Sequence, residues 1–280
     1  MDFHNLLENL NQQYFFSDLT IERGIEKESL RVTKDGYISN TKHPEALGSS
    51  YTNSSITTDF AESLIEIVTP TYTTVDELYE KLKTIHFFIN KNLKNDEMLW
   101  SFSMPPKIAD ESSINIATYG KSNMGRLKYI YRKGLAIRYG KTMQCVSGIH
   151  YNFSLSDKSL KQLGYSSQNE KNKAYLNLIR NFKRLFWFVL IEFGNSPVVD
   201  KSFVAGRTSD LNILNKTDLF KPDATSLRMS DIGYQSKAQK NLNFKYNDLD
   251  EFLSGLRSAI INPYPDFEDL GLKDIHNEFQ

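Results

Sequence analysis

The segment from Gly24 to Val32, Gly-Ile-Glu-Lys-Glu-Ser-Leu-Arg-Val, ends in an alternation of apolar and charged residues. This pattern is typical of a β-strand, because successive side chains of a strand point to opposite faces. The turn-forming run Lys34-Asp35-Gly36 follows almost directly. We therefore predict a strand that leads into a hairpin.

Two carboxylates, Glu26 and Glu28, fall about 7 Å apart on one face of this strand, and that face turns apolar towards the end of the segment. Such carboxylates are costly to hold unless a cation lies over them. One explanation is a solvated edge strand whose acids pair with Lys27 or Arg31 of neighbouring chains. The other is a cation-binding face, and this explanation depends on what the rest of the chain offers.

A second strand is predicted from Leu64 to Thr69. The spacing of Glu62 and Glu66 is compatible with one face of a helix, but β-branched residues prevail in this run and Pro70 ends it. We favour the strand, which carries the carboxylate of Glu66. A further carboxylate, Asp59, lies near its start.

A third strand is predicted from Met143 to Leu155, the segment with the most regular alternation in the chain. Its polar face carries Gln144, His150, Asn152 and Ser154, and its apolar face carries Met143, Cys145, Ile149, Tyr151, Phe153 and Leu155. The cysteine has no basic partner on this apolar face, so we interpret it as a core residue and not as a nucleophile.

The clearest helix begins at Thr74, where Glu77 completes the spacing of a capping box. It continues as an apolar stripe of Val75, Leu78, Leu82, Ile85, Ile89 and Leu93. A short amphipathic helix is expected around residues 6–10. The segment 173–193 is apolar on most sides, which predicts a buried helix. Asn247 is expected to cap a last helix that ends before Pro263.

Strands and long helices mix without strict alternation, which favours an α+β fold with a mainly antiparallel sheet. We expect residues 1–280 to form a single domain. The 34 basic and 34 acidic residues cancel, so no overall field favours nucleic acid or an anionic membrane. The longest strictly apolar run, Leu185 to Ile191, is too short to span a bilayer. The N-terminal residues show no export signal and the single cysteine excludes an internal disulfide, so we expect a cytoplasmic protein.

The acids and the imidazole of the three predicted strands suit a hard cation, because Mg²⁺ takes oxygen ligands and commonly shares substrate phosphates. The basic and aromatic segment Tyr119 to Gly140 is a matching candidate for an anion binder, since arginine forks fit phosphate and carboxylate. A solvated basic helix explains this segment equally well. The run Gly120 to Gly125 is not a Walker motif, because Arg126-Leu127 replaces the required Gly-Lys-Ser/Thr order.

Several of these runs together resemble the proteobacterial type of glutamate–cysteine ligase, the first enzyme of glutathione synthesis. The matching runs span nearly the whole chain and are Gly24–Val32, His43–Gly48, Ile56–Glu62 through Glu66, Tyr131–Gly134, Arg138–Gly140 with Met143–Gln144, Ser147–Ser154 and Ala224–Tyr234. The resemblance implies a glutamine-synthetase-like catalytic sheet whose concave face holds ATP and magnesium. It also implies that the γ-carboxylate of L-glutamate is joined to the amine of L-cysteine through γ-glutamyl phosphate.

The resemblance implies roles for individual residues as well. The family's metal-ligand positions match Glu26, Glu28, Asp59, Glu66 and His150. The positions near the cysteine substrate match Gln144, Arg228 and Tyr234, with Tyr131 and Arg132 beside them. Arg132 and Arg228 are the expected catalytic residues. In this arrangement the cations neutralise the phosphates while positioned donors hold the transferring phosphoryl group in line.

The chain departs from the family pattern at its end, His276–Gln280. Family members continue well beyond this point, with another strand that carries a metal-binding glutamate and a phosphate-facing arginine. We therefore expect an incomplete sheet with an exposed edge, which a complementing C-terminal chain would complete. Two alternatives stay open. One is a non-catalytic fragment that binds Mg·ATP or such a chain, and the other is a carboxylate–amine ligase with a different acceptor amine.

Overall fold

A computed structural model describes the chain over residues 19–94, 96–233, 242, 244–262, 264–268 and 270. The helix expected around residues 6–10 and the candidate residue Tyr234 lie outside these described residues. The assignment of residues 1–280 to one domain stays a prediction.

The largest element is a five-stranded antiparallel sheet built around the long strand β1 (Ile21–Val32). On one edge of β1 lies β3 (Leu64–Val68), which pairs in turn with β2 (Ile56–Thr58). On the other edge, β5 (Ile149–Leu155) pairs with the N-terminal part of β1 and β4 (Met98–Leu99) with its C-terminal end. The idea of a solvated edge strand is therefore wrong, because β1 has partners along both edges.

The predicted hairpin after β1 is confirmed. The amide of Gly36 donates to the carbonyl of Thr33 (2.9 Å), and the amide of Thr33 donates to the carbonyl of Tyr37 (2.8 Å). Gly36 has a φ of 79°, a left-handed conformation that glycine adopts without the cost of a Cβ. The chain then returns antiparallel to β1, where Ile38 pairs with Val32.

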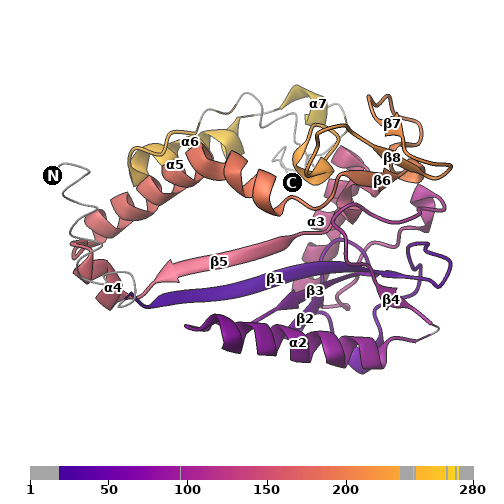
Figure 1. Ribbon diagram of the computed structural model, residues 1–280, viewed down its shortest axis with the longest axis horizontal. Helices are drawn as coiled ribbons and strands as arrows, with labels where there is room; N and C mark the ends of the chain where they lie inside the picture. Colours follow the sequence, from indigo (N-terminus) through magenta and orange to yellow (C-terminus); the bar gives the residue numbers. More distant parts are fainter. Residues whose placement is uncertain are drawn as a thin grey trace.

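Two hydrophobic clusters cover the two faces of the sheet. On one face Ile65 and Ile67 of β3 pack with Ile85 and Ile89 of α2 (Val75–Asn92), which lies along the sheet (Figure 1). On the other face the larger cluster contains Leu30, Val32, Phe60, Leu64, Cys145, Phe203 and Leu227. Burial of such side chains contributes about 1.5–3 kcal/mol each relative to full exposure, so both clusters fix β1 and β3 in place.

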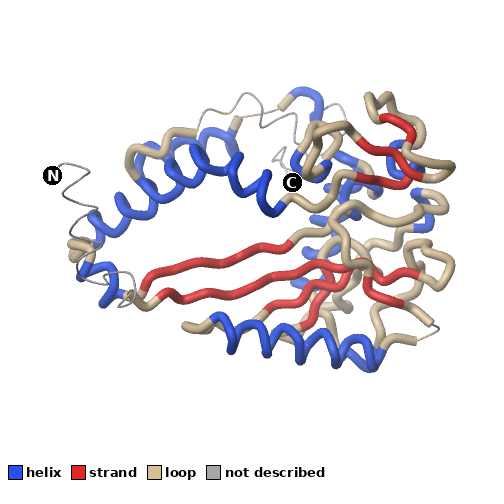
Figure 2. Tube along the Cα trace, in the orientation of Figure 1, coloured by secondary structure: helices blue, strands red, loops and turns tan. Residues whose placement is uncertain are grey.

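The remaining elements lie on the side of the sheet opposite to α2 (Figures 1 and 2). A small antiparallel sheet has the order β6-β8-β7, and four helices accompany it. The helices are α3 (Asn123–Tyr139), α4 (Asp157–Gln162), α5 (Gln168–Phe193) and α6 (Leu249–Ile261), followed by the short turn α7 (Pro265–Glu268), and the strands are β6 (Val198–Asp200), β7 (Asn212–Ile213) and β8 (Asp218–Phe220). No helix in the described part combines the length and hydrophobicity needed to cross a membrane. The expected α+β fold with mainly antiparallel sheets is confirmed.

Three local predictions are corrected. The strand expected from Met143 to Leu155 begins only at Ile149, because Thr142–Cys145 forms a 3₁₀ turn, η3. The helix expected to be buried, α5, has one buried residue, Leu176, among its described side chains. The cap of α6 is Asp248, whose side chain accepts from the amide of Glu251, and not the preceding asparagine.

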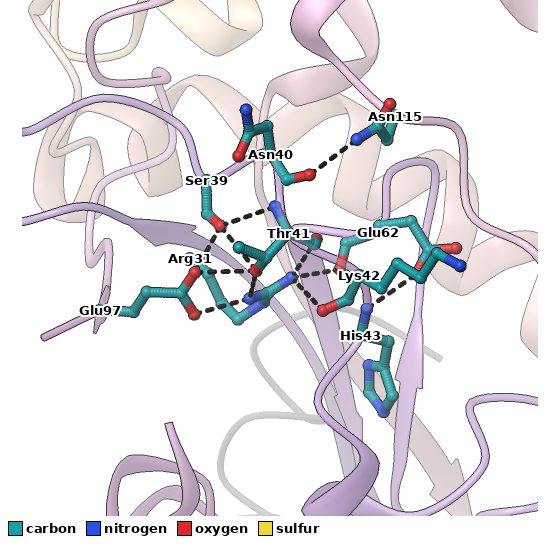
Figure 3. A network of polar contacts seen from close by, with 9 residues as sticks. All are labelled: Arg31, Ser39, Asn40, Thr41, Lys42, His43, Glu62, Glu97 and Asn115. Carbon is teal, nitrogen blue, oxygen red and sulfur yellow. Dashed lines mark hydrogen bonds and ion pairs between the residues drawn. The ribbon is translucent and has the colours of Figure 1, made fainter. Parts of the chain in front are cut away.

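The face of β1 that looks away from the carboxylates carries a fully buried cation, Arg31 (Figure 3). Its guanidinium donates to Glu97 (2.6 Å), to the hydroxyl of Thr41 (2.6 Å) and to the carbonyl of Glu62 (3.1 Å). Glu97 is also buried, with 4% of its side chain exposed. This ion pair joins β1 to the loop before β4 and to the loop that follows the hairpin.

We expect Glu97→Gln to lower the free energy of unfolding by about 3 kcal/mol, because it leaves the buried guanidinium of Arg31 without a counter-charge. Urea unfolding measures the change. The control is Glu80→Gln, whose ion pair with Lys83 is exposed, so its effect stays below about 1 kcal/mol. Equal losses in the two variants would contradict a structural role of the buried pair.

Candidate active site

The register of the sheet brings together acidic side chains of β1 and β3 and an imidazole of β5. Glu28 on β1 lies directly opposite Glu66 on β3, and Glu26 on β1 lies directly opposite His150 on β5. Opposed residues of an antiparallel pair point to the same face, and residues two apart on one strand do so as well. The four side chains therefore share one face of the sheet, as the sequence predicts.

Glu26 is tied to strand β5. Its carboxylate lies 3.2 Å from Nδ1 of His150 and accepts a hydrogen bond of 3.2 Å from Nδ2 of Asn152. Half of the His150 side chain is exposed, so the pair is accessible from solvent. The polar face expected for this strand, with its imidazole and amide, is present over the residues that do form β5.

Glu28 lies deeper than its neighbour on β1. Its Oε2 accepts a hydrogen bond of 2.7 Å from the amide of Gly148, in the turn just before β5. Burial and the negative charge of Asp59 raise the pKa of Glu28 to about 7, although Arg228 and the Gly148 amide act in the opposite direction. The carboxylate is therefore only partly ionised near neutral pH.

The pKa values of Asp59 and Glu66 are raised as well. Burial raises the pKa of Asp59, against the opposing effect of Arg132. Burial raises the pKa of Glu66 too, and the charges of Asp59 and Glu26 add to this increase. Removal of carboxylates from water and their mutual repulsion both disfavour the ionised forms. The acidic face therefore has more negative charge than its surroundings neutralise, which is the electrostatic condition for binding a cation.

No three histidine, cysteine or acidic side chains converge on one point within the described residues in a way that would enclose a metal ion. This observation excludes a cage of the kind that encloses structural zinc, which takes four protein ligands. It is compatible with magnesium, which usually keeps several waters and takes only one or two carboxylates together with substrate phosphates. The donor set, carboxylate oxygens with one imidazole at the side, fits such a hard cation.

A cavity of about 200 Å³ opens beside the carboxylates and is lined by Glu28, Asp59, Met143, Gln144, Val146, His150 and Arg228. Gln144 comes from η3 (Thr142–Cys145) and is buried, and its Nε2 has no hydrogen-bond partner among the described residues. Arg228 comes from the 3₁₀ turn η5 (Leu227–Met229). A buried donor without an acceptor is costly, so this cavity is prepared for a polar ligand.

Arg132 is held firmly beside the cavity by helix α3. Its Nε donates to the carbonyl of Asp59 and its Nη1 to the carbonyl of Lys128 (3.1 Å). Its guanidinium also stacks on the ring of Tyr119, 4.6 Å from the ring centre. The neighbouring Tyr131 is 58% exposed and does not line the cavity. The structure therefore brings together all the described candidate residues except Tyr131, which points elsewhere on the helix.

Two further residues shape the site, and their sequence patterns do not reveal this role. Tyr119 donates to the carbonyl of Thr58 (2.8 Å) and supports the Arg132 guanidinium from below. Gly148 provides the amide that contacts Glu28. Tyr119 falls in the basic segment that a surface helix would explain, but it precedes helix α3. Gly148 falls inside the strand predicted from Met143 to Leu155, which in the structure begins only after it.

Comparison with known proteins places these features in a family. The family model described as Glutamate-cysteine ligase matches residues 5–280. The chain is 51% identical over 256 residues to the glutamate–cysteine ligase of Pseudomonas aeruginosa strain PAO1, and 49% identical over 254 residues to that of Pseudomonas putida strain KT2440. In both cases the match covers 89% of this chain and 48% of the relative. The chain thus spans about half the length of the curated relatives it matches.

Solved structures give the same result. The fold superimposes on glutamate–cysteine ligase from Francisella tularensis in complex with AMP with a TM-score of 0.85 and 35% identity, over 94% of this chain and 52% of that one. It also matches a bifunctional glutathione synthetase from Pasteurella multocida, with a TM-score of 0.75 and 29% identity, over 94% and 33% of the two chains. Since sequence, fold and the predicted face of carboxylates agree, the chain belongs to the glutamate–cysteine ligase family.

Proposed function

We propose that the chain provides a large part of the active site of an ATP-dependent ligase that joins L-glutamate to L-cysteine. The observation that carries this proposal is the cavity in which Glu28 and Asp59 face Arg228, on a chain of this family. The AMP complex of the relative from Francisella tularensis supports nucleotide as one ligand.

In the proposed reaction the glutamate γ-carboxylate attacks the γ-phosphorus of ATP, which gives γ-glutamyl phosphate and ADP. The cysteine nitrogen then attacks the acyl carbon, loses a proton, and phosphate leaves. No side chain of the protein needs to act as nucleophile, because the substrate carboxylate attacks. The residues of the site therefore contribute by binding, orienting and balancing charge.

We propose that magnesium ions bind along the acidic face, with Glu26, Glu28, Asp59, Glu66 and His150 as the ligand positions and one or two carboxylates for each ion. Burial raises the pKa values of Glu28, Asp59 and Glu66, and neighbouring carboxylates add to the increase for Glu28 and Glu66. This supports the assignment, because a bound cation stabilises the ionised form of each group. Bound magnesium would neutralise phosphate oxygens of the nucleotide. The carboxylates hold the cation near the cavity.

For the substrates we propose Arg228 and Gln144 as direct contacts, since both line the cavity and the Nε2 donor of Gln144 is without a partner in the described part. Arg132, which the chain holds in one orientation, balances the charge of the phosphoryl group from the side. Tyr131 and Tyr234 are proposed at the cysteine side from the resemblance alone. A cytoplasmic location stays a prediction.

We also propose that polypeptide equivalent to the rest of the relatives' length covers an apolar face of the chain. This apolar face is formed by α5, where Phe182 is 53%, Leu185 60% and Phe188 51% exposed. Within the described residues β5 pairs only with β1, so its other edge is open to strand addition. Large contiguous apolar surfaces are rare on monomers and mark interfaces.

We expect Leu185→Lys to weaken association with a separately produced polypeptide that corresponds to the remaining half of the Pseudomonas aeruginosa relative. A charge at a contact that becomes buried costs roughly 2 kcal/mol or more, so the affinity falls at least about tenfold. Fluorescence of Trp187 reports the association. The control is Phe87→Lys on α2, equally exposed at 70% but away from the apolar face. Identical affinities for both variants would argue against this interface.

We expect phosphate release from ATP, with L-glutamate present, to be faster with L-cysteine than with ammonia as the acceptor. The chain is assayed alone and with the complementing polypeptide. Arg228→Lys is expected to lower turnover roughly 10–100-fold, because it replaces a planar fork by a single point charge. Arg257→Lys on the exposed side of α6 serves as the control. Faster turnover with ammonia would contradict the proposed acceptor, and nucleotide binding without turnover would favour the non-catalytic alternative.

The pKa of Glu28 predicts how the stability of the metal-free protein depends on pH. The folded state keeps this carboxyl protonated up to about pH 7, while the unfolded chain loses the proton near the ordinary value of 4.5. The folded state thus binds more protons between these values, and its stability falls as the pH rises from about 5 to 8.

We expect Glu28→Gln to flatten this dependence and to be about 1–3 kcal/mol more stable than the parent protein at pH 8, since the amide oxygen still accepts from Gly148. Urea unfolding with EDTA at pH 5 and pH 8 measures it, and added Mg²⁺ should stabilise the parent more than the variant. Glu22→Gln, on the same face at the far end of β1, is the control. A parent protein that becomes more stable towards pH 8 would show the assignment wrong.

A further inference from the structure

Gly148 lies between the acidic side chain of Glu28 and the basic side chain of Arg228 in the candidate site. Its amide donates to Glu28, and its carbonyl accepts from the Glu28 amide at 3.0 Å, so its backbone is fixed on β1. The position that a Cβ of this residue would occupy lies next to the guanidinium of Arg228. The residue thus contacts both the acidic side and the basic side of the cavity.

A side chain at this position would meet the guanidinium of Arg228. A Cβ built on Gly148 would lie 2.5 Å from Nη2, 2.7 Å from Cζ and 2.9 Å from Nη1, and these are its three nearest neighbours. Real Cβ atoms essentially never come closer than 3.0 Å to other atoms. An alanine there would therefore force the guanidinium to move.

The backbone of Gly148 does not itself require glycine. Its φ lies outside the left-handed region that disfavours other residues, unlike that of Gly36 or Gly140. Backbone conformation therefore does not explain why this position holds a glycine. The explanation that the structure offers is steric, because the guanidinium of Arg228 occupies the space that a side chain would need.

The rest of the Arg228 residue is fixed more firmly than its side chain. The preceding Leu227 is fully buried and its amide donates to the carbonyl of Ser196 (2.8 Å). A Cβ on Gly233 would collide with the carbonyl of Arg228, so the backbone is enclosed there too. The guanidinium has no hydrogen-bond partner in the described part of the chain.

We propose that Gly148 is a positioning residue: by lacking a side chain it allows the Arg228 guanidinium to lie against the backbone just before β5, beside Glu28 and Asp59. This inference rests on the proposed role of Arg228 in substrate binding. The absent side chain sets how closely the cation approaches the carboxylates, and so where an anionic group of the substrate binds.

The test compares Gly148→Ala with Gly24→Ala. Gly24 is a buried glycine of the same sheet without a left-handed φ, and a Cβ there meets nothing closer than 3.7 Å. Besides lowering turnover, Arg228→Lys should raise the Michaelis constant of the substrate that Arg228 contacts. We expect Gly148→Ala to raise the same constant by roughly tenfold or more, whereas Gly24→Ala leaves it unchanged. We also expect Gly148→Ala to shift the Nε–H resonance of Arg228 in the NMR spectrum, assigned by its loss in Arg228→Lys.

The double variant Gly148→Ala, Arg228→Lys identifies the route of the effect. A lysine lacks the planar group that the new Cβ would meet, so the double variant should match Arg228→Lys alone within about twofold. Fully additive losses, or an unshifted Arg228 resonance in Gly148→Ala, would overturn the proposal. If Gly148→Ala alone does not fold, the double variant must fold, and its failure to do so would overturn the proposal as well. The resonance also decides the question when no variant turns over, which separates this inference from the proposed reaction.

Discussion

Repulsion among carboxylates on one face of the sheet is the constraint on which this site depends. Glu28 and Glu66 lie opposite each other, and Asp59 adds a third charge from the loop before β3. Burial weakens the solvation of each carboxylate and so strengthens the repulsion between them. A face of this kind is stable when protons or cations neutralise it, which links the acidity of the site to the metal and nucleotide that we propose for it.

The protein holds these charges together with its opposite face and its core. Arg31 and Glu97 form a buried ion pair beneath β1, and the isoleucines of β3 pack on α2. Above the sheet, Leu30 continues the acidic face of β1 as part of the larger hydrophobic cluster. Because interiors are close-packed, β1 cannot bend away to separate its carboxylates. The buried ion pair and the two hydrophobic clusters thus stabilise a sheet whose carboxylates repel one another.

The two arginines on the basic side of the site differ in how the protein holds them. Arg132 makes hydrogen bonds to main-chain carbonyls and stacks on Tyr119, so its donors are largely used by the protein. Arg228 lies against Gly148 without such bonds in the described part of the chain. One arginine is therefore fixed as a source of positive charge, and the other has donors available for a ligand. This difference is the reason why we propose different roles for the two arginines in a phosphoryl and acyl transfer.

Sequence alone determined the elements whose patterns are local. The alternation before Val32, the turn at Gly36 and the cap at Thr74 depend on neighbours within a few residues, and the structure has all three. The resemblance of long runs also identified the family and the acidic residues that share one face. These features are fixed by backbone geometry and short-range hydrogen bonds, which a sequence pattern expresses directly.

Only the tertiary structure decided which groups meet. Register, and not periodicity, sets Glu28 against Glu66 and Glu26 against His150, since a shift of one residue would turn every side chain to the other face. The alternating segment before Ile149 became a 3₁₀ turn because its residues, among them Cys145, pack into the core from a turn and have no strand partner. The apolar helix α5 is largely exposed because burial depends on what packs against a helix, which its own sequence does not contain. The contact between Gly148 and Arg228 joins residues 80 positions apart, and only long-range packing creates such a neighbour.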